Sequence, residues 1–215
     1  MSEMVSTTSI APDVTRRGDR LLVAMLVVAA ATVVVALAGL WTYKTSPGQQ
    51  RPAPEQWPTT TALTRSLDRP TLVLFAHPRC TCTRATLAAL HRLVTDLPGR
   101  FHTTIVLASP PGLDDSFAGI DTVVTAHTIR GATVVRDIDD VEAERFGAAT
   151  SGHVVVYDRD GTLLFRGGIT SSRGHVGDSV GGEHLRTLLT ATSPPPTPPR
   201  TFSAPVFGCD LQEQP

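Results

Sequence analysis

The chain has 215 residues, with 19 basic and 20 acidic side chains and a formal net charge of −1. That length suits one ordinary domain with accessory segments. The balanced charge excludes the basic stripe of a nucleic-acid-binding protein, so we expect no nucleic acid among the partners. The three cysteines are too few for a disulfide scaffold, and their odd number predicts a free thiol or a transient thiol partner.

Residues 21–43 form an uncharged, apolar run that is long enough to cross a bilayer as one helix. Three arginines stand near the end of residues 1–20, which predicts that this segment is cytoplasmic and that the rest of the chain is exported. A signal peptide cleaved near residues 36–38 is the alternative, and it exports the same part of the chain. We therefore expect a single-pass protein of the cytoplasmic (inner) membrane whose C-terminal domain is extracytoplasmic.

Residues 44–62 contain four prolines among polar residues, which predicts a semi-rigid spacer. Residues 63–192 follow as one domain in which strand-like and helix-like patterns alternate. This order predicts an α/β layer fold with a mixed sheet. The predicted strands are 71–76, 101–108, 132–135, 153–158 and 162–166, and the predicted helices are 83–97, 114–129, 139–146 and 183–191.

Residues 193–215 form a Pro-rich tail with an apolar tip. The run at 193–199 cannot form a helix or a central strand. A disordered end would not need Val206 and Phe207 beside Cys209, so we expect the tip to dock on the domain.

Cys80 and Cys82 stand where a buried strand gives way to a helix. Orphan backbone N–H groups and the helix dipole favour a thiolate at such a helix start. Positive charge from His77, Arg79 and Arg84 would lower the pKa of a nearby cysteine further. Because the thiolate is the species that attacks disulfides, we predict that Cys80 is a nucleophile. A zinc site is disfavoured, since the chain has no second cysteine pair.

The approach to the cysteines, residues 72–80, resembles the strand and active-site turn of the thioredoxin superfamily. The first cysteine follows Phe75 by five residues, as it does there, and the resemblance extends over residues 63–189 by element order. It implies a thioredoxin-like three-layer fold and thiol–disulfide exchange with a protein or small-molecule substrate. A membrane helix ahead of such a domain is similar to the extracytoplasmic TlpA and ResA-like proteins.

Three patches, at residues 77–82, 167–178 and 206–209, resemble the RedB group of membrane-anchored thioredoxin-like proteins. The second patch lies in a loop with six glycines between residues 167 and 182. Glycines allow tight turns and close backbone approach. We therefore expect Arg173 and His175 to support the site, with a solvated surface loop as the alternative.

Two departures from the superfamily pattern concern the redox pair and substrate docking. The usual pair is Cys-x-x-Cys, whose second position is here Thr83. A Cys-x-Cys disulfide closes a smaller and more strained ring, so it is more easily reduced. The resolving thiol is accordingly Cys82 or Cys209. No cis-proline precedes the hairpin near residues 150–152, which argues against ordinary docking of a substrate peptide.

The main prediction is a membrane-anchored, extracytoplasmic thiol–disulfide oxidoreductase with no resident cofactor. Two alternatives stay open. Cys80, Cys82 and His153 resemble the copper set of SCO-type proteins, and thiolate with imidazole suits copper. The spacing there is Cys-x-x-x-Cys, and a strand-edge histidine with a satisfied ring is the simpler interpretation of His153. A thiol peroxidase is the second alternative, although no Thr-x-x-Cys pattern leads into Cys80.

Overall fold

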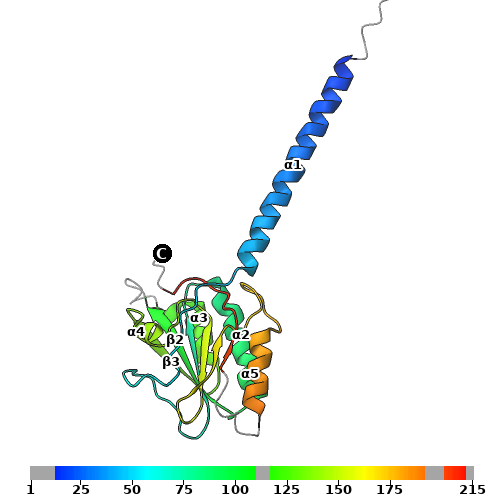
Figure 1. The fold of residues 1–215 in the computed structure, drawn as a ribbon. Helices are drawn as coiled ribbons and strands as arrows, with labels where there is room; N and C mark the ends of the chain where they lie inside the picture. Colours follow the sequence, from blue (N-terminus) through cyan, green and yellow to red (C-terminus); the bar gives the residue numbers. More distant parts are fainter. Residues whose placement is uncertain (1–12, 110–116, 192–200, 212–215) are drawn as a thin grey trace, which may run out of the picture. The chain divides into compact units, whose positions relative to one another are not determined.

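The computed structural model describes residues 13–109, 117–191 and 201–211. The chain divides after residue 44 into an N-terminal unit and a compact second unit (Figure 1). Parts of three predicted segments lie outside the described residues: most of the N-terminal segment 1–20, the start of helix 114–129, and the Pro-rich strap with the last four residues of the chain.

Helix α1 (Asp13–Thr45) is the only element of the first unit within the described residues. Within the stretch Gly18–Thr45, an 18-residue window has a mean hydropathy of 2.9, and none of that window is buried. The helix is long and apolar enough to cross a bilayer, and it contains the predicted span over residues 21–43. A membrane anchor and a signal sequence both have this form.

The second unit is built on a mixed six-stranded sheet in the order β3-β2-β1-β4-β5-β6. Parallel pairs join the first three strands, and a hairpin runs antiparallel to β1. This is the mixed sheet that the sequence predicts. The strands are β1 (Thr71–Ala76), β2 (His102–Ser109), β3 (Ala132–Ile138), β4 (His153–Tyr157), β5 (Leu163–Gly167) and β6 (Phe202–Ser203).

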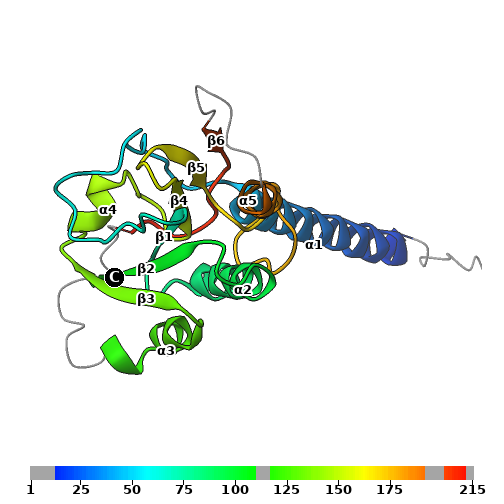
Figure 2. The same cartoon turned by 90° about the horizontal axis from the view of Figure 1, so that it is seen from below.

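Both faces of the sheet are covered, which explains why β1 is a continuous apolar run (Figure 2). Leu72 and Leu74 point to the face covered by α2 (Thr81–Asp96), α3 (Asp121–Thr128) and α5 (Val180–Thr190). Val73 and Phe75 point to the other face, where the short helix α4 (Val141–Arg145) packs. A 3-10 turn, η1 (Phe117–Gly119), precedes α3. The three layers are therefore helices, sheet, and α4 together with the chain that precedes β1.

That preceding chain, residues 45–63, is named here the N-terminal arm, and it corrects the prediction of a spacer over residues 44–62. The ring of Trp57 packs edge-on against Phe146 and Tyr157, with centroids 5.1 and 5.3 Å apart. The main-chain N–H of Trp57 donates to the carbonyl of Gly161 at 2.7 Å. The arm packs on the domain despite its prolines, because the side chain of Trp57 contacts the buried residues Phe146 and Tyr157.

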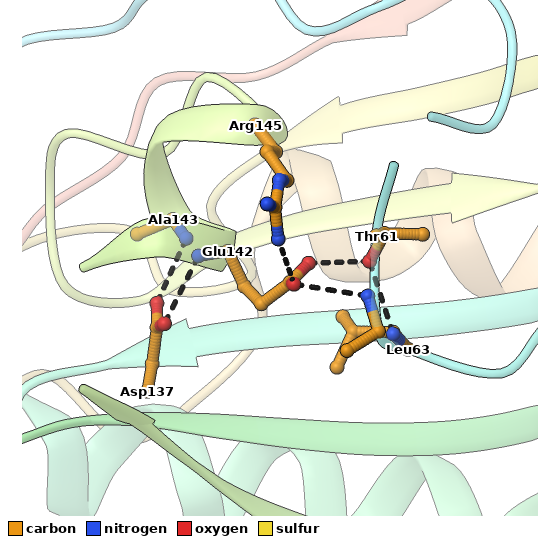
Figure 3. A network of polar contacts seen from close by, with 7 residues as sticks. Thr61, Leu63, Asp137, Glu142, Ala143 and Arg145 are labelled. Atoms are coloured by element: carbon orange, nitrogen blue, oxygen red, sulfur yellow. Dashed lines mark hydrogen bonds and ion pairs between the residues drawn. The ribbon is translucent and has the colours of Figure 1, made fainter. Parts of the chain in front are cut away.

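A carboxylate network fixes the end of the arm to α4 (Figure 3). The buried Glu142 carboxylate accepts hydrogen bonds from the Thr61 hydroxyl and from the Ala62 N–H, the latter at 3.0 Å, and it pairs with Arg145. Asp137 at the end of β3 accepts from the Glu142 N–H at 2.9 Å. The start of α4 is thus capped by one carboxylate and joined to the arm by another.

Candidate active site

Cys80 is the N-cap residue of α2, as predicted from the strand-to-helix transition. Its N–H donates to the His77 carbonyl at 3.1 Å, and its own carbonyl accepts from the Thr83 N–H at 3.0 Å. Its side chain makes no capping hydrogen bond. The turn therefore holds the backbone of Cys80 and leaves its sulfur for other contacts.

The sulfur of Cys80 lies 2.6 Å from the sulfur of Cys209, a residue 129 positions later in the chain. Neither belongs to a disulfide in this structure. The expected docking of the C-terminal tip is confirmed, since Val206 and Leu211 are buried against the domain. Of the two candidate partners of Cys80, Cys209 has its sulfur at 2.6 Å, and the thiol of Cys82 also forms a hydrogen bond with Cys80.

The C-terminal segment, residues 201–211, is held beside the cysteines by main-chain pairing with the turn before β4. The Ser151 N–H donates to the Cys209 carbonyl at 2.8 Å, and the Leu211 N–H donates to the Ala149 carbonyl at 2.9 Å. A Cβ atom at Gly208 would overlap the Ser151 carbonyl, so only glycine permits this approach. The position of the Cys209 sulfur is therefore set by backbone contacts on both sides of it.

The Gly-rich loop reaches the site through Arg173 and Gly174. The Arg173 guanidinium donates to the carbonyl of Gly208, and the backbone of Gly174 forms a hydrogen bond with Cys82. His175 is exposed on the same loop. The loop thus supports the site through one of the two predicted side chains and through its backbone.

The three thiols form one hydrogen-bonded group around Cys80. The Cys82 thiol, and after it the thiol and backbone N–H of Cys209, lower the pKa of Cys80 against the opposing effect of burial. Donation to Cys80 and burial raise the pKa of Cys82. Cys80 is therefore the group that carries the thiolate, and Cys82 remains a thiol that donates to it.

The basic side chains that we expected to lower the pKa of Cys80 do not account for it. The Arg79 side chain is exposed, and the Arg84 guanidinium pairs with exposed Asp121 at 3.0 Å. Burial lowers the pKa of His77, whose Nδ1 accepts from the Arg79 N–H at 3.2 Å, so its ring is neutral near pH 7. Hydrogen bonds from neighbouring thiols and backbone N–H groups replace the predicted charges.

Ser151 is a site residue that the sequence pattern did not single out. Its hydroxyl accepts from the His77 N–H at 2.9 Å and lies 3.0 Å from the Thr83 hydroxyl. Thr83 also donates to the His77 carbonyl at 2.8 Å. The residue in the second Cys-x-x-Cys position thus ties the first turn of α2 to the turn that pairs with Cys209. The missing cis-proline near this turn was the signal that could have identified Ser151.

The SCO-like copper set gains no support from the geometry. His153 pairs with Phe75 across the two strands and points to the face of the sheet opposite α2. Burial, and then the charge of Arg166, lower the pKa of His153 to about 4. Over the described ranges, no three His, Cys, Asp or Glu side chains are grouped to hold a metal ion.

Comparison with known proteins finds likeness in fold. No protein-family model matches the sequence, and no curated protein matches it. An uncharacterized conserved protein from Geobacillus kaustophilus superposes with a TM-score of 0.52 at 18% identity, over 80% of this chain and 94% of that one. A hypothetical protein from Sinorhizobium meliloti 1021 gives 0.50 at 19%, over 79% and 95%.

A secreted disulfide oxidoreductase from Mycobacterium tuberculosis, homologous to E. coli DsbE, aligns at 16% identity with a TM-score of 0.36, over 56% of this chain and 80% of that one. The mixed sheet, with a cysteine at the start of the helix that follows β1, is the arrangement that the resemblance to thioredoxin implies. The second unit of this chain therefore has a thioredoxin-like α/β fold, and an apolar helix precedes it.

Proposed function

We propose that the protein is a thiol–disulfide oxidoreductase whose redox pair is Cys80 and Cys209. The observation that carries this proposal is the 2.6 Å separation of the two sulfurs. Main-chain pairing on either side of Cys209 keeps the sulfurs together, so a disulfide needs only a small movement. Two electrons and two protons leave the thiol pair when it is oxidised, and a substrate disulfide that accepts them becomes two thiols.

Cys82 serves this pair as a hydrogen-bond donor. It stabilises the thiolate of Cys80 within the redox pair. Its own pKa is raised, so it stays protonated and is a poor attacking group at neutral pH. The second thiol of the redox pair is accordingly Cys209, which takes the place of the second cysteine of the usual Cys-x-x-Cys pair.

We further propose that α1 anchors the protein in the cytoplasmic membrane with the thioredoxin-like domain outside, as the resemblance to the RedB group implies. The arginines before the helix support this orientation. A phosphatase reporter that is active only after export, fused behind Leu211, is expected to be active. Activity of a cytoplasm-dependent reporter at the same position would contradict the orientation.

The redox pair is tested on the full chain in detergent, equilibrated in glutathione buffers and mapped for disulfides. Wild type is expected to form an intramolecular Cys80–Cys209 disulfide and to reduce a model disulfide. Cys209→Ser loses both, whereas the matched control Cys82→Ser retains the disulfide. Equal denaturation midpoints of the two variants exclude misfolding as the cause. A Cys80–Cys82 disulfide in wild type, with unchanged turnover of Cys209→Ser, would refute the assignment.

A further inference from the structure

Given the proposed redox pair, we infer that Cys209 is the sulfur that exchanges with the external substrate and that Cys80 acts behind it as the internal thiolate. This inverts the order expected from the helix-start position, where the N-cap cysteine meets the substrate first. It rests on which sulfur solvent can reach, on how firmly the C-terminal segment is held, and on which thiolate leaves more easily.

The two cysteines of the proposed redox pair, Cys80 and Cys209, differ in how far each residue is exposed to solvent. Cys80 is 3% exposed and Cys82 is 6% exposed, so both lie inside the domain. Cys209 is partly exposed, and its neighbour Asp210 is exposed. A substrate sulfur must approach one of the two bonded sulfurs in line, and access limits the rate of such attack. Cys209 is the member of the pair that offers this approach.

The C-terminal segment is built into the domain and does not have to leave for exchange to occur. A Cβ atom at Gly167 would overlap the backbone of Ala204, so these two chains pack with no room for a side chain. The Gly48 N–H of the N-terminal arm donates to the Val206 carbonyl at 2.8 Å. Contacts before Cys209 therefore add to the Ser151 pairing, and Cys80 stays covered while Cys209 stays at the surface.

The docked segment also occupies the edge at residues 149–151 that an extended substrate would otherwise pair with. A substrate consequently gains no main-chain pairing there. Cys209, which is partly exposed, remains accessible to it. This fits the absence of a cis-proline from the turn that contains Ser151.

The chemistry favours the same order. A substrate thiolate attacks the Cys209 sulfur of the Cys80–Cys209 disulfide, a new bond forms between the two sulfurs, and Cys80 leaves as a thiolate. A second substrate thiolate then attacks the substrate sulfur of this mixed disulfide, so a substrate disulfide and the Cys209 thiolate are released, and the latter takes a proton from solvent. Hydrogen bonds from Cys82 that stabilise the Cys80 thiolate make it the better leaving group. Reduction of a substrate runs the same steps backwards.

The test uses the oxidised full chain in detergent with glutathione as the thiol probe. The reaction is quenched with acid within the first turnover, and released thiols are then alkylated with N-ethylmaleimide. Trypsin cleavage at Arg79 and Arg84 isolates residues 80–84, and cleavage after Arg200 isolates residues 201–215. Glutathione is expected on Cys209 and the maleimide on Cys80, in at least tenfold excess over the reverse labelling.

The possible outcomes separate the inference from the proposed function. A Cys80–Cys209 disulfide that places glutathione on Cys80 overturns the inference and leaves the proposed redox pair standing. No Cys80–Cys209 disulfide at all overturns both. Cys82→Ser keeps a hydroxyl donor beside Cys80 but has no thiol that could carry the label, so in this variant glutathione is still expected on Cys209, even where the exchange is slower. A shift of glutathione to Cys80 in that variant would mean that Cys82 redistributes the label, and it would also overturn the assignment.

Discussion

The N-terminal arm and the C-terminal segment both make main-chain contacts with the same domain, and they differ in the contacts that they add. The arm packs an aromatic ring, Trp57, into a cluster of side chains and ends in the Glu142 network. The C-terminal segment is held by its backbone, with glycine contacts on either side and the Arg173 guanidinium on the Gly208 carbonyl. Side-chain packing tolerates small shifts, whereas backbone contacts at glycine fix a position closely. The arm therefore contributes to stability, and the C-terminal segment sets the position of a sulfur.

The largest expected effect is that of Gly208→Ala. The added Cβ overlaps the Ser151 carbonyl, so the backbone on either side of Cys209 must move. We expect the free energy of unfolding to fall by about 2–3 kcal/mol. Formation of the Cys80–Cys209 disulfide in glutathione buffer is expected to fall at least about tenfold. Gly119→Ala is the control, because a Cβ there meets nothing within 4 Å. Wild-type disulfide formation in Gly208→Ala would show that the backbone contact does not position the sulfur.

Trp57→Ala tests the arm in the same way. Loss of the ring from its contacts with Phe146 and Tyr157 is expected to lower the free energy of unfolding by about 2–3 kcal/mol, measured by denaturant titration. The Cys80–Cys209 redox equilibrium is expected to change less than about twofold, because the ring packs on Phe146 and Tyr157 and not on the cysteines. Leu67→Ala, at a 73% exposed side chain, is the matched control. A redox change as large as that of Gly208→Ala would remove the distinction between the two regions.

Arg173→Gln sharpens the comparison within the C-terminal segment. It removes a charged donor from the Gly208 carbonyl, and we expect the disulfide to form about tenfold more slowly in stopped-flow oxidation. The control is Arg186→Gln, at a half-exposed ion pair with Asp96 away from the segment. Equal rates in the two variants would mean that the guanidinium does not help to hold Cys209.

Cys82→Ala is expected to give the smallest change in free energy and a change in pH dependence. Removing the thiol that donates to Cys80 raises the pKa of Cys80, so the thiolate absorbance near 240 nm appears at higher pH. A lowered pKa in the folded state makes the reduced protein more stable as pH rises towards the free value of about 8.5. In the variant, the free energy of unfolding of the reduced protein is therefore expected to rise less with pH over this range. An unchanged titration would show that Cys82 does not stabilise the thiolate.

The sequence predicted the elements whose patterns are complete within themselves. The apolar run at residues 71–76 and the Asp-Gly hairpin turn identify β1 and the β4–β5 pair from neighbouring residues alone. The sequence predicted a spacer in place of the arm, because the partners of Trp57 lie about a hundred positions away and the residues around Trp57 do not identify them. The position of Cys80 was predictable, but the groups that lower its pKa were not, since one of them belongs to Cys209.

In the proposed redox pair, the separation of 129 positions between Cys80 and Cys209 would couple oxidation to folding. In an unfolded chain, two thiols so far apart seldom meet, and a bond between them closes a very large loop. Such a bond is expected to stabilise the folded state by about 4–5 kcal/mol through the lost freedom of the unfolded chain. Thermodynamic linkage works in both directions, so folding favours the disulfide by the same amount. Anything that loosens the domain therefore makes the protein a stronger oxidant, and reduction makes it easier to unfold.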